Sequence, residues 1–306
     1  MYLEHFGLTR SPFRIVPDTQ FFYDGGDRGA TLEALIYAIG QGEGIVKITG
    51  EVGSGKTMLC RMLLQRLDPT VEVIYLANPS VAPNEILHAI AHELALRLPP
   101  GAPRVDVMHA LQMHLVTRHA RGRRVVLFVE EAQRMPLDTL EEIRLLSNLE
   151  TESHKLMQIV LIGQPELDDN LRQQHIRQLR ERITHSFRLA PLGRDEIAAY
   201  LAYRLRAAGY GGPVLFTGNV VEQMARTSQG LVRRINILAD KTLLAAYAEN
   251  TRVLEPRHVR SAAEDSEFHV SWRVRLARDR RLLAALGGAA AVLLALLLWR
   301  AVSQGG

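Results

Sequence analysis

The fold of this chain is decided by one short stretch, Gly50-Glu51-Val52-Gly53-Ser54-Gly55-Lys56-Thr57. It fits the pattern G-x-x-x-x-G-K-[ST] at every position. The glycines let backbone N–H groups wrap a chain of phosphates, and the helix that follows points its positive end at the same place. Lys56 supplies a charge for the β and γ phosphates, and the Thr57 hydroxyl reaches a magnesium ion. The whole stretch is therefore predicted to bind a nucleoside triphosphate with Mg²⁺.

The residues on either side of this loop have the structure that such a loop needs. A short, mostly apolar run at residues 45–49 predicts a strand, and leucine and methionine recur at helical spacing over 58–67. Further strands are predicted at 71–76, 125–129, 156–162 and 183–189, and helices at 83–98, 105–120 and 136–149. Strands that alternate with helices predict an α/β fold, a P-loop NTPase with a parallel sheet and helices on both faces.

Two carboxylates follow the apolar run Val125–Val129. Glu130 is expected to hold the magnesium ion, directly or through water, and Glu131 to orient the attacking water. The first of these positions is usually an aspartate. Magnesium demands near-octahedral geometry at about 2.0–2.1 Å, so the extra methylene of Glu130 is either absorbed by a water-mediated contact or slows turnover. The alternative is that both glutamates merely begin a solvated loop.

Beyond Pro191 the predicted strands stop and only helices follow, at residues 195–208, 218–227 and 232–248. This pattern predicts a small all-α lid domain after the nucleotide-binding domain. The sequence thus predicts a nucleotide-binding domain at residues 1–189 and a helical lid at 190–260. A basic juxtamembrane linker at 261–281, a transmembrane helix at 282–299 and a short tail at 300–306 are predicted to follow.

The segment Leu282–Trp299 has 18 residues without a charge. As a helix it spans about 27 Å, close to the roughly 30 Å hydrocarbon core of a bilayer. Arginines flank it, with five in residues 273–281 and only Arg300 after it, which predicts that the large N-terminal part is cytoplasmic. The alternative reading is a buried core helix, against which the flanking arginines argue.

Composition adds a few limits. Hydrophobic residues make up 47% and charged residues 23%, which is ordinary for a globular protein. A formal net charge of +4 does not by itself indicate a nucleic-acid partner. The one cysteine, Cys60, allows no internal disulfide and is expected to be buried in a reducing compartment.

Five motifs in order, ITGEVGSGKT, VEEAQ, LIGQPEL, LRERI and GLVRRIN, resemble those of the ExeA-type bacterial AAA+ ATPases, and most closely their branch that serves MSHA pilus biogenesis. The resemblance runs from about Met1 to about Val259. It implies an ATP hydrolase of the bacterial inner membrane, anchored by a single pass with its ATPase domain in the cytoplasm. Such proteins support assembly of a type IV pilus or type II secretion machine, so partners from that machine are expected. Other copies of the chain are expected as well, with a ring as one form of the assembly. The choice of ATP over GTP rests on this resemblance.

The resemblance also implies roles for three further residues. Gln164 matches the polar residue that senses the γ-phosphate or the attacking water. Arg182 matches the arginine finger that reaches a neighbouring subunit's nucleotide, with Arg180 as second choice, and Arg233 matches the lid arginine that contacts the phosphates. Two departures stand out: the family generally has DEAQ where this chain has Glu130 first, and G-x-P-R where it has Val232.

Two other functions compete with this one. In the first, Glu130 blunts hydrolysis and the chain is a non-catalytic nucleotide switch or scaffold. In the second, it is a DNA-directed AAA+ ATPase, and the arginines of residues 172–182 contact phosphates of DNA or form a solvated basic face. DNA-directed relatives usually add a reading domain, which the residues after Val259 do not suggest, so nucleic acid is not expected as a partner.

Overall fold

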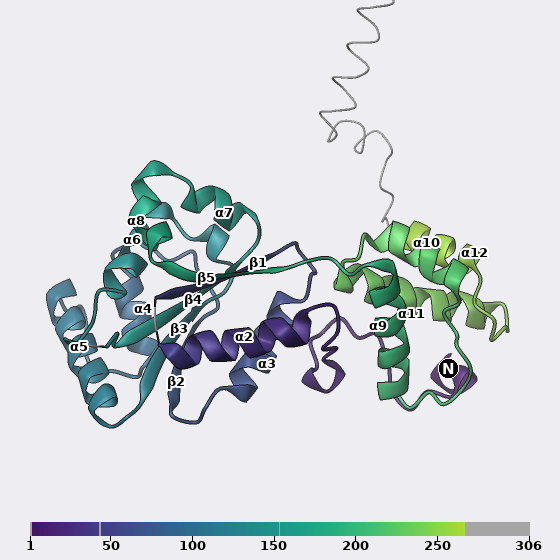
Figure 1. Ribbon diagram of the computed structural model, residues 1–306, viewed down its shortest axis with the longest axis horizontal. Helices are drawn as coiled ribbons and strands as arrows, with labels where there is room; N and C mark the ends of the chain where they lie inside the picture. The colour runs from purple at the N-terminus through teal and green to yellow at the C-terminus, as the bar shows by residue number, and fades with distance from the viewer. Residues whose placement is uncertain (1, 43, 153, 267–306) are drawn as a thin grey trace, which may run out of the picture.

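The computed structural model describes residues 2–42, 44–152 and 154–266. Its centre is a five-stranded sheet in the order β2-β3-β4-β1-β5 (Figure 1). Every neighbouring pair of strands is parallel. The strands are β1 (Ile45–Gly50), β2 (Val71–Leu76), β3 (Arg124–Val129), β4 (Met157–Gly163) and β5 (Ile183–Leu189). The parallel α/β sheet predicted from the sequence is confirmed, and all five predicted strands are found.

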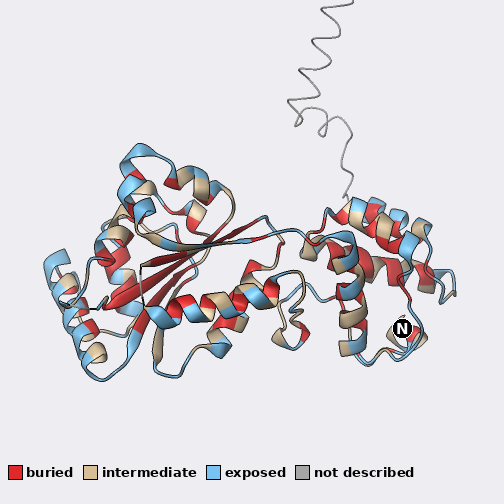
Figure 2. Cartoon of the chain, in the orientation of Figure 1, coloured by how far each residue is buried: buried red, intermediate tan, exposed pale blue. Residues whose placement is uncertain are grey.

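Helices cover both faces of the sheet because its strands are apolar on both sides. Along β3, Leu127 packs with α4 to α8, whereas Val126 and Phe128 pack with α2 and α3. Figure 2 shows the buried residues running along the inner strands. The helices of this part are α2 (Arg28–Gln41), α3 (Lys56–Arg66), α4 (Ile86–Glu93), α5 (Arg104–Ala120), α6 (Leu137–Leu146), α7 (Glu166–Leu171) and α8 (Arg177–Glu181), with short 3₁₀ turns η2 (Ala132–Arg134) and η3 (Gln174–Ile176).

The helix predicted over residues 83–98 is shorter in the structure. It begins at Ile86 and ends at Glu93. Two residues later Ala95 adopts a left-handed backbone conformation, with φ of 50°, which no continuing α-helix allows. The periodic apolar residues of 94–98 pack on the same core without helical backbone.

A second hydrophobic core belongs to the helices after the sheet. These are α9 (Arg194–Ala207), α10 (Gly218–Ser228), α11 (Val232–Ala248) and α12 (Pro256–Asp265). They share one cluster of buried side chains that is separate from the two sheet cores, and Figure 1 shows these helices grouped to one side of the sheet.

The N-terminal segment belongs to this second core and not to the sheet. It contains α1 (Tyr2–Phe6) and the 3₁₀ turn η1 (Thr19–Phe21). Its buried side chains Phe6, Leu8, Phe13 and Phe21 all lie in the helical cluster. Aromatic residues early in the chain thus fill a core built by its late helices, so the packing of residues 2–21 does not follow the predicted division at residue 189.

The predicted boundary at residue 260 falls inside α12, whose side chains Val259, Ala262 and Ala263 are buried in the helical core. The alanines look weakly apolar in sequence, but they pack because α12 lies close against α11.

The predicted transmembrane segment 282–299, the tail 300–306 and residues 267–281 of the predicted linker lie outside the described residues. Within the described part of the chain, none of the helices combines the length and apolarity needed to cross a bilayer.

Candidate nucleotide-binding site

The phosphate-binding loop connects the end of β1 to the start of α3. β1 ends at Gly50 and α3 begins at Lys56. Between them Gly53 and Gly55 have φ values of 79° and 105°, a region that glycine enters without steric cost. A Cβ on Gly53 would lie 2.8 Å from the Cβ of Arg233. The loop therefore packs directly against the helical part of the molecule, and glycine makes this approach possible.

Lys56 lies inside the loop, with 8% of its surface exposed. Its Nζ donates hydrogen bonds to the carbonyls of Gly50 at 2.7 Å and Glu51 at 3.1 Å. Burial lowers the pKa of Lys56, although the charge of Glu131 and other carboxylates opposes this shift. The hydrogen-bond partners of the Lys56 ammonium group are neutral carbonyls. It can exchange them for phosphate oxygens, which are negatively charged and bind an ammonium group more strongly.

Glu130 is held by two hydroxyl groups, one on each carboxylate oxygen. The Thr57 hydroxyl donates to Oε1 at 2.9 Å, and the Tyr75 hydroxyl donates to Oε2 at 2.6 Å. Burial and the bond to Glu130 raise the pKa of Tyr75, which keeps the phenol protonated as a donor. A threonine hydroxyl beside a carboxylate, next to a phosphate-binding loop, is the hard oxygen donor set that magnesium prefers. The residues present thus fit a magnesium ion, which Thr57 and Glu130 would hold.

Glu131 has a left-handed backbone conformation, with φ of 53°. Two side-chain amides donate to its Oε2, Gln133 Nε2 at 2.8 Å and Gln164 Nε2 at 3.0 Å. Burial pushes the pKa of Glu131 upward, but these two hydrogen bonds and the Lys56 charge outweigh it and leave the pKa below its usual value. The carboxylate is therefore ionised, fixed in direction and ready to accept a hydrogen bond from water.

Gln133 is a site residue to which sequence reasoning gave no role. Besides bonding Glu131, its Oε1 accepts a hydrogen bond from the backbone N–H of Gln164 at 3.0 Å, and its carbonyl accepts one from Asn170 at 3.0 Å. It thereby ties the end of β3 to the end of β4. A Cβ on Gly163 would lie 3.0 Å from the Gln133 amide oxygen, so a small residue is needed there. The signal was present, since Gln133 is the last residue of the VEEAQ motif.

Arg28, on the first turn of α2, is a second residue that the sequence did not suggest. Its guanidinium is buried and donates to the Ser54 carbonyl at 3.1 Å and to the Gly26 carbonyl at 3.2 Å. Burial lowers its pKa, and Glu196 partly opposes this. Arg28 thus supports the phosphate-binding loop through its bond to the Ser54 carbonyl. An arginine in an unremarkable D-R-G sequence carries no local sign of this contact.

A cavity of about 460 Å³ opens over the loop. This is within the size range of sites for small molecules. Its lining brings together Lys56, Thr57, Glu131, Gln164 and Arg233. The N-terminal segment also contributes to the lining, through residues 14–17 and 21–23. Two apolar side chains of this segment, Ile15 and Val16, are exposed, so the cavity has apolar as well as charged lining.

Arg233 lies in the first turn of α11, directly over the loop. Its backbone N–H donates to the Gly53 carbonyl at 3.0 Å. The helix begins at Val232, so the missing proline of the G-x-P-R pattern does not move its start.

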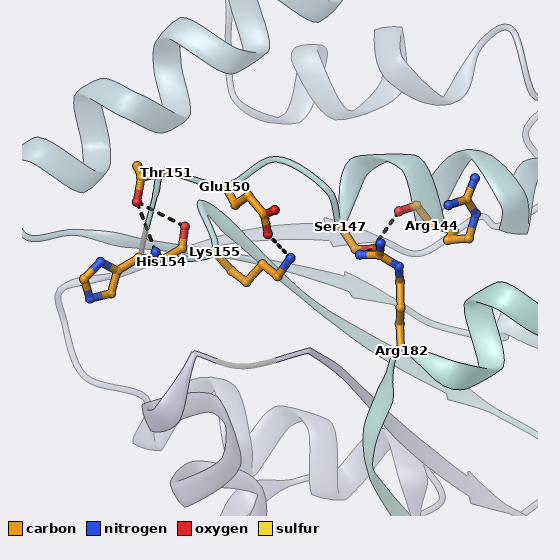
Figure 3. A network of polar contacts seen from close by, with 7 residues as sticks. All are labelled: Arg144, Ser147, Glu150, Thr151, His154, Lys155 and Arg182. Atoms are coloured by element: carbon orange, nitrogen blue, oxygen red, sulfur yellow. Dashed lines mark hydrogen bonds and ion pairs between the residues drawn. The ribbon is translucent and has the colours of Figure 1, made fainter.

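Arg182 does not line this cavity. It precedes β5, and the pairing of β1 with β5 runs from Ile45–Ile183 to Gly50–Leu189. Arg182 is thus at the amino end of the sheet, one strand length or roughly 20 Å from the loop. Its Nη1 donates to Ser147 Oγ at 3.3 Å, and Ser147 donates to the Arg144 carbonyl (Figure 3). Arg180, the second choice, is exposed on α8.

Residues 39–171 match the family model of the AAA domain. These residues form an AAA-type P-loop domain. The chain is also 41% identical over 251 residues to General secretion pathway protein A of Aeromonas hydrophila. That match covers 82% of this chain but 46% of the relative, so the chain spans less than half the length of this relative.

Solved structures resemble the AAA domain and its helical neighbour in fold. Cdc6p of Pyrobaculum aerophilum has a TM-score of 0.64 at 20% identity and covers 85% of this chain and 74% of its own. The Aeropyrum pernix ORC1 protein in complex with DNA has a TM-score of 0.60 at 21% identity, with 84% and 70% covered. The RuvB branch migration motor of Thermotoga maritima has a TM-score of 0.55 at 16% identity, with 82% and 73% covered. At these identities the similarity concerns the fold alone.

Proposed function

We propose that this chain is an ATPase of the ExeA type that uses an ATP cycle to support a bacterial secretion or pilus machine. The observation that carries the proposal is the identity to a general secretion pathway protein, found together with an assembled phosphate site. The likeness to DNA-associated proteins is one of fold and gives no reason to prefer a DNA-directed function.

The residues of the site divide the work by position. Backbone N–H groups of the loop and Lys56 hold the phosphates, and Thr57 and Glu130 hold the metal. A bound Mg²⁺ neutralises charge that develops on the phosphates during transfer. Glu131 orients the attacking water, since its carboxylate is ionised and held at one oxygen by two amides. Gln164 lies beside it, directly after the neighbouring strand β4, and is assigned to the γ-phosphate.

The helical part acts as a lid in this proposal. Arg233 is fixed against the loop by its own backbone N–H, and its guanidinium is the group assigned to the phosphates. Nucleotide bound in the cavity would contact both the sheet and the helical part, so binding would favour one arrangement of the two.

Arg182 is assigned to a neighbouring copy. At the amino end of the sheet it cannot reach the phosphates bound by its own chain, whereas a second copy docked against this edge can use it. This assignment requires a homo-oligomer with nucleotide at the subunit interfaces, for which a ring is the closed form. Arg180 is the alternative finger, being exposed on the preceding helix.

The position in the cell is also part of the proposal. Segment 282–299 would anchor the chain in the bacterial inner membrane with the AAA domain in the cytoplasm. The secretion machine is favoured by the relative's name, and the MSHA-like pilus by the sequence motifs alone.

The test is ATP turnover as a function of protein concentration, for the full chain in detergent and for a version ending before Leu282. Turnover per chain that rises with concentration, and that is lost in both Lys56→Ala and Arg182→Ala, supports an interface ATPase. ATP binding without turnover at every concentration would instead assign the chain to the nucleotide switches. Tight, salt-sensitive DNA binding would revive the DNA-directed alternative.

A further inference from the structure

The magnesium-binding part of the site departs from the usual P-loop arrangement in the length of the Glu130 side chain. A carboxylate on a longer stem has one more rotatable bond and more orientations to lose on binding a metal. A further contact must restrict the Glu130 side chain if this magnesium ligand is to keep a fixed position. The structure shows a contact that does so.

That contact comes from Tyr75 on the neighbouring strand β2. Its hydroxyl donates to Glu130 Oε2 at 2.6 Å, while Thr57 donates to Oε1 at 2.9 Å. The two donors lie on different elements, α3 and β2, so the carboxylate is gripped from two directions. Neither of its oxygens can swing without breaking a hydrogen bond.

Tyr75 is itself held in place. Its ring packs in the core between the sheet and helices α2 and α3. Cys60, one helical turn after Thr57, is 1% exposed and belongs to the same core. Tyr75, Glu130 and Thr57 thus form a chain of side-chain hydrogen bonds that leads from this core to the site.

We propose that Tyr75 is the positioning residue for Glu130, and that its hydroxyl fits the longer carboxylate to the magnesium position that an aspartate usually serves. The inference rests on the proposed ATP- and Mg²⁺-binding function. It predicts that the metal site requires a glutamate at position 130. An aspartate at 130 would be too short to bond Thr57 and Tyr75 together, so Glu130→Asp would weaken the metal site and not improve it.

The experiment measures binding of a fluorescent ATP analogue to the full chain, first in EDTA and then during a Mg²⁺ titration. The variants are Tyr75→Phe, Glu130→Asp and the double variant, with Tyr37→Phe as the matched control, because Tyr37 is an exposed tyrosine. Phenylalanine keeps the ring packing of Tyr75 and removes only the hydroxyl.

Tyr75→Phe is expected to raise the Mg²⁺ midpoint roughly ten-fold, the size expected for one hydrogen bond to a charged group, and to leave affinity in EDTA unchanged. Glu130→Asp should raise the midpoint as well, and adding Tyr75→Phe to it should change little more. Coinciding Mg²⁺ curves for Tyr75→Phe and the unmodified chain would overturn the inference. So would an equal loss in EDTA, which marks a merely structural effect, or fully additive effects in the double variant. If the unmodified chain bound no analogue in either condition, the proposed function would fail together with the inference.

Discussion

The two ends of the parallel sheet differ in how firmly their functional side chains are held. At the carboxyl end, Lys56, Glu130 and Glu131 each make at least two hydrogen bonds of 3.1 Å or shorter. At the amino end, the Arg182 side chain makes one hydrogen bond within the described part of the chain, of 3.3 Å to Ser147 (Figure 3). The side chains at the carboxyl end are therefore the more firmly fixed.

The largest expected effect removes the charge at the firmly held end. Lys56→Ala should weaken binding of an ATP analogue by at least about a hundred-fold, because the variant loses the buried cation that faces the phosphates. Fluorescence titration measures it. Lys155→Ala is the control, since Lys155 pairs with Glu150 at the opposite end of the sheet. Similar losses in both variants would remove the distinction between the two ends.

The next largest effect tests the amino end. Arg182→Ala should lower turnover about 10³-fold, the low end of the range for an arginine finger, and leave nucleotide affinity unchanged. Steady-state kinetics and analogue binding separate the two quantities. Arg177→Ala is a matched control on the same exposed segment, where Arg177 pairs with Glu181. A parallel fall in affinity would mean that Arg182 serves its own chain's site.

A smaller effect probes the network around Glu131. Gln133→Leu removes one donor to Oε2, so the pKa of Glu131, which is held below its usual value, should rise. A base with a raised pKa is protonated at higher pH. The acid limb of the pH–turnover profile should therefore shift to higher pH. At neutral pH the carboxylate stays ionised, so the fall in turnover expected there, about ten-fold, comes from the weaker orientation of Glu131.

Gln173→Leu is the control for this variant, because Gln173 is an exposed glutamine away from the site. An acid limb that stays where it was in Gln133→Leu would show that Gln133 supports the loop without acting on Glu131.

The smallest effect concerns the single bond that holds Arg182. Ser147→Ala should change turnover by no more than about three-fold, since a weak hydrogen bond at a half-buried site contributes little. Concentration-dependent turnover of this variant should keep its shape. A loss as large as that of Arg182→Ala would show that the amino end is organised as tightly as the carboxyl end.

The sequence was sufficient for the parts whose chemistry is local. Strand 183–189 was predicted correctly because a charged segment precedes it and a proline follows it. The phosphate-binding loop was predicted from its glycines. The sequence was insufficient where a contact depends on distant segments. Nothing near Tyr75 indicates that its hydroxyl meets Glu130 on the next strand, and nothing near Phe13 indicates that it packs under helices that lie after residue 190. Periodicity reports which face of an element is apolar, but it does not report which other element covers that face.

The packing of the N-terminal segment with the late helices has a mechanical consequence. The chain passes between the helical part and the sheet part twice, once near Gly26 and once near Leu192, and a Cβ on Gly26 would lie 2.7 Å from the Leu192 side chain. Two adjacent connections define an axis. Rotation about this axis would strain the two connections least, whereas a swivel would stretch one of them against the other. The cavity wall at residues 14–17 links both parts, because the Pro17 carbonyl accepts a hydrogen bond from Arg61 on α3 while Phe13 and Phe21 pack in the helical core.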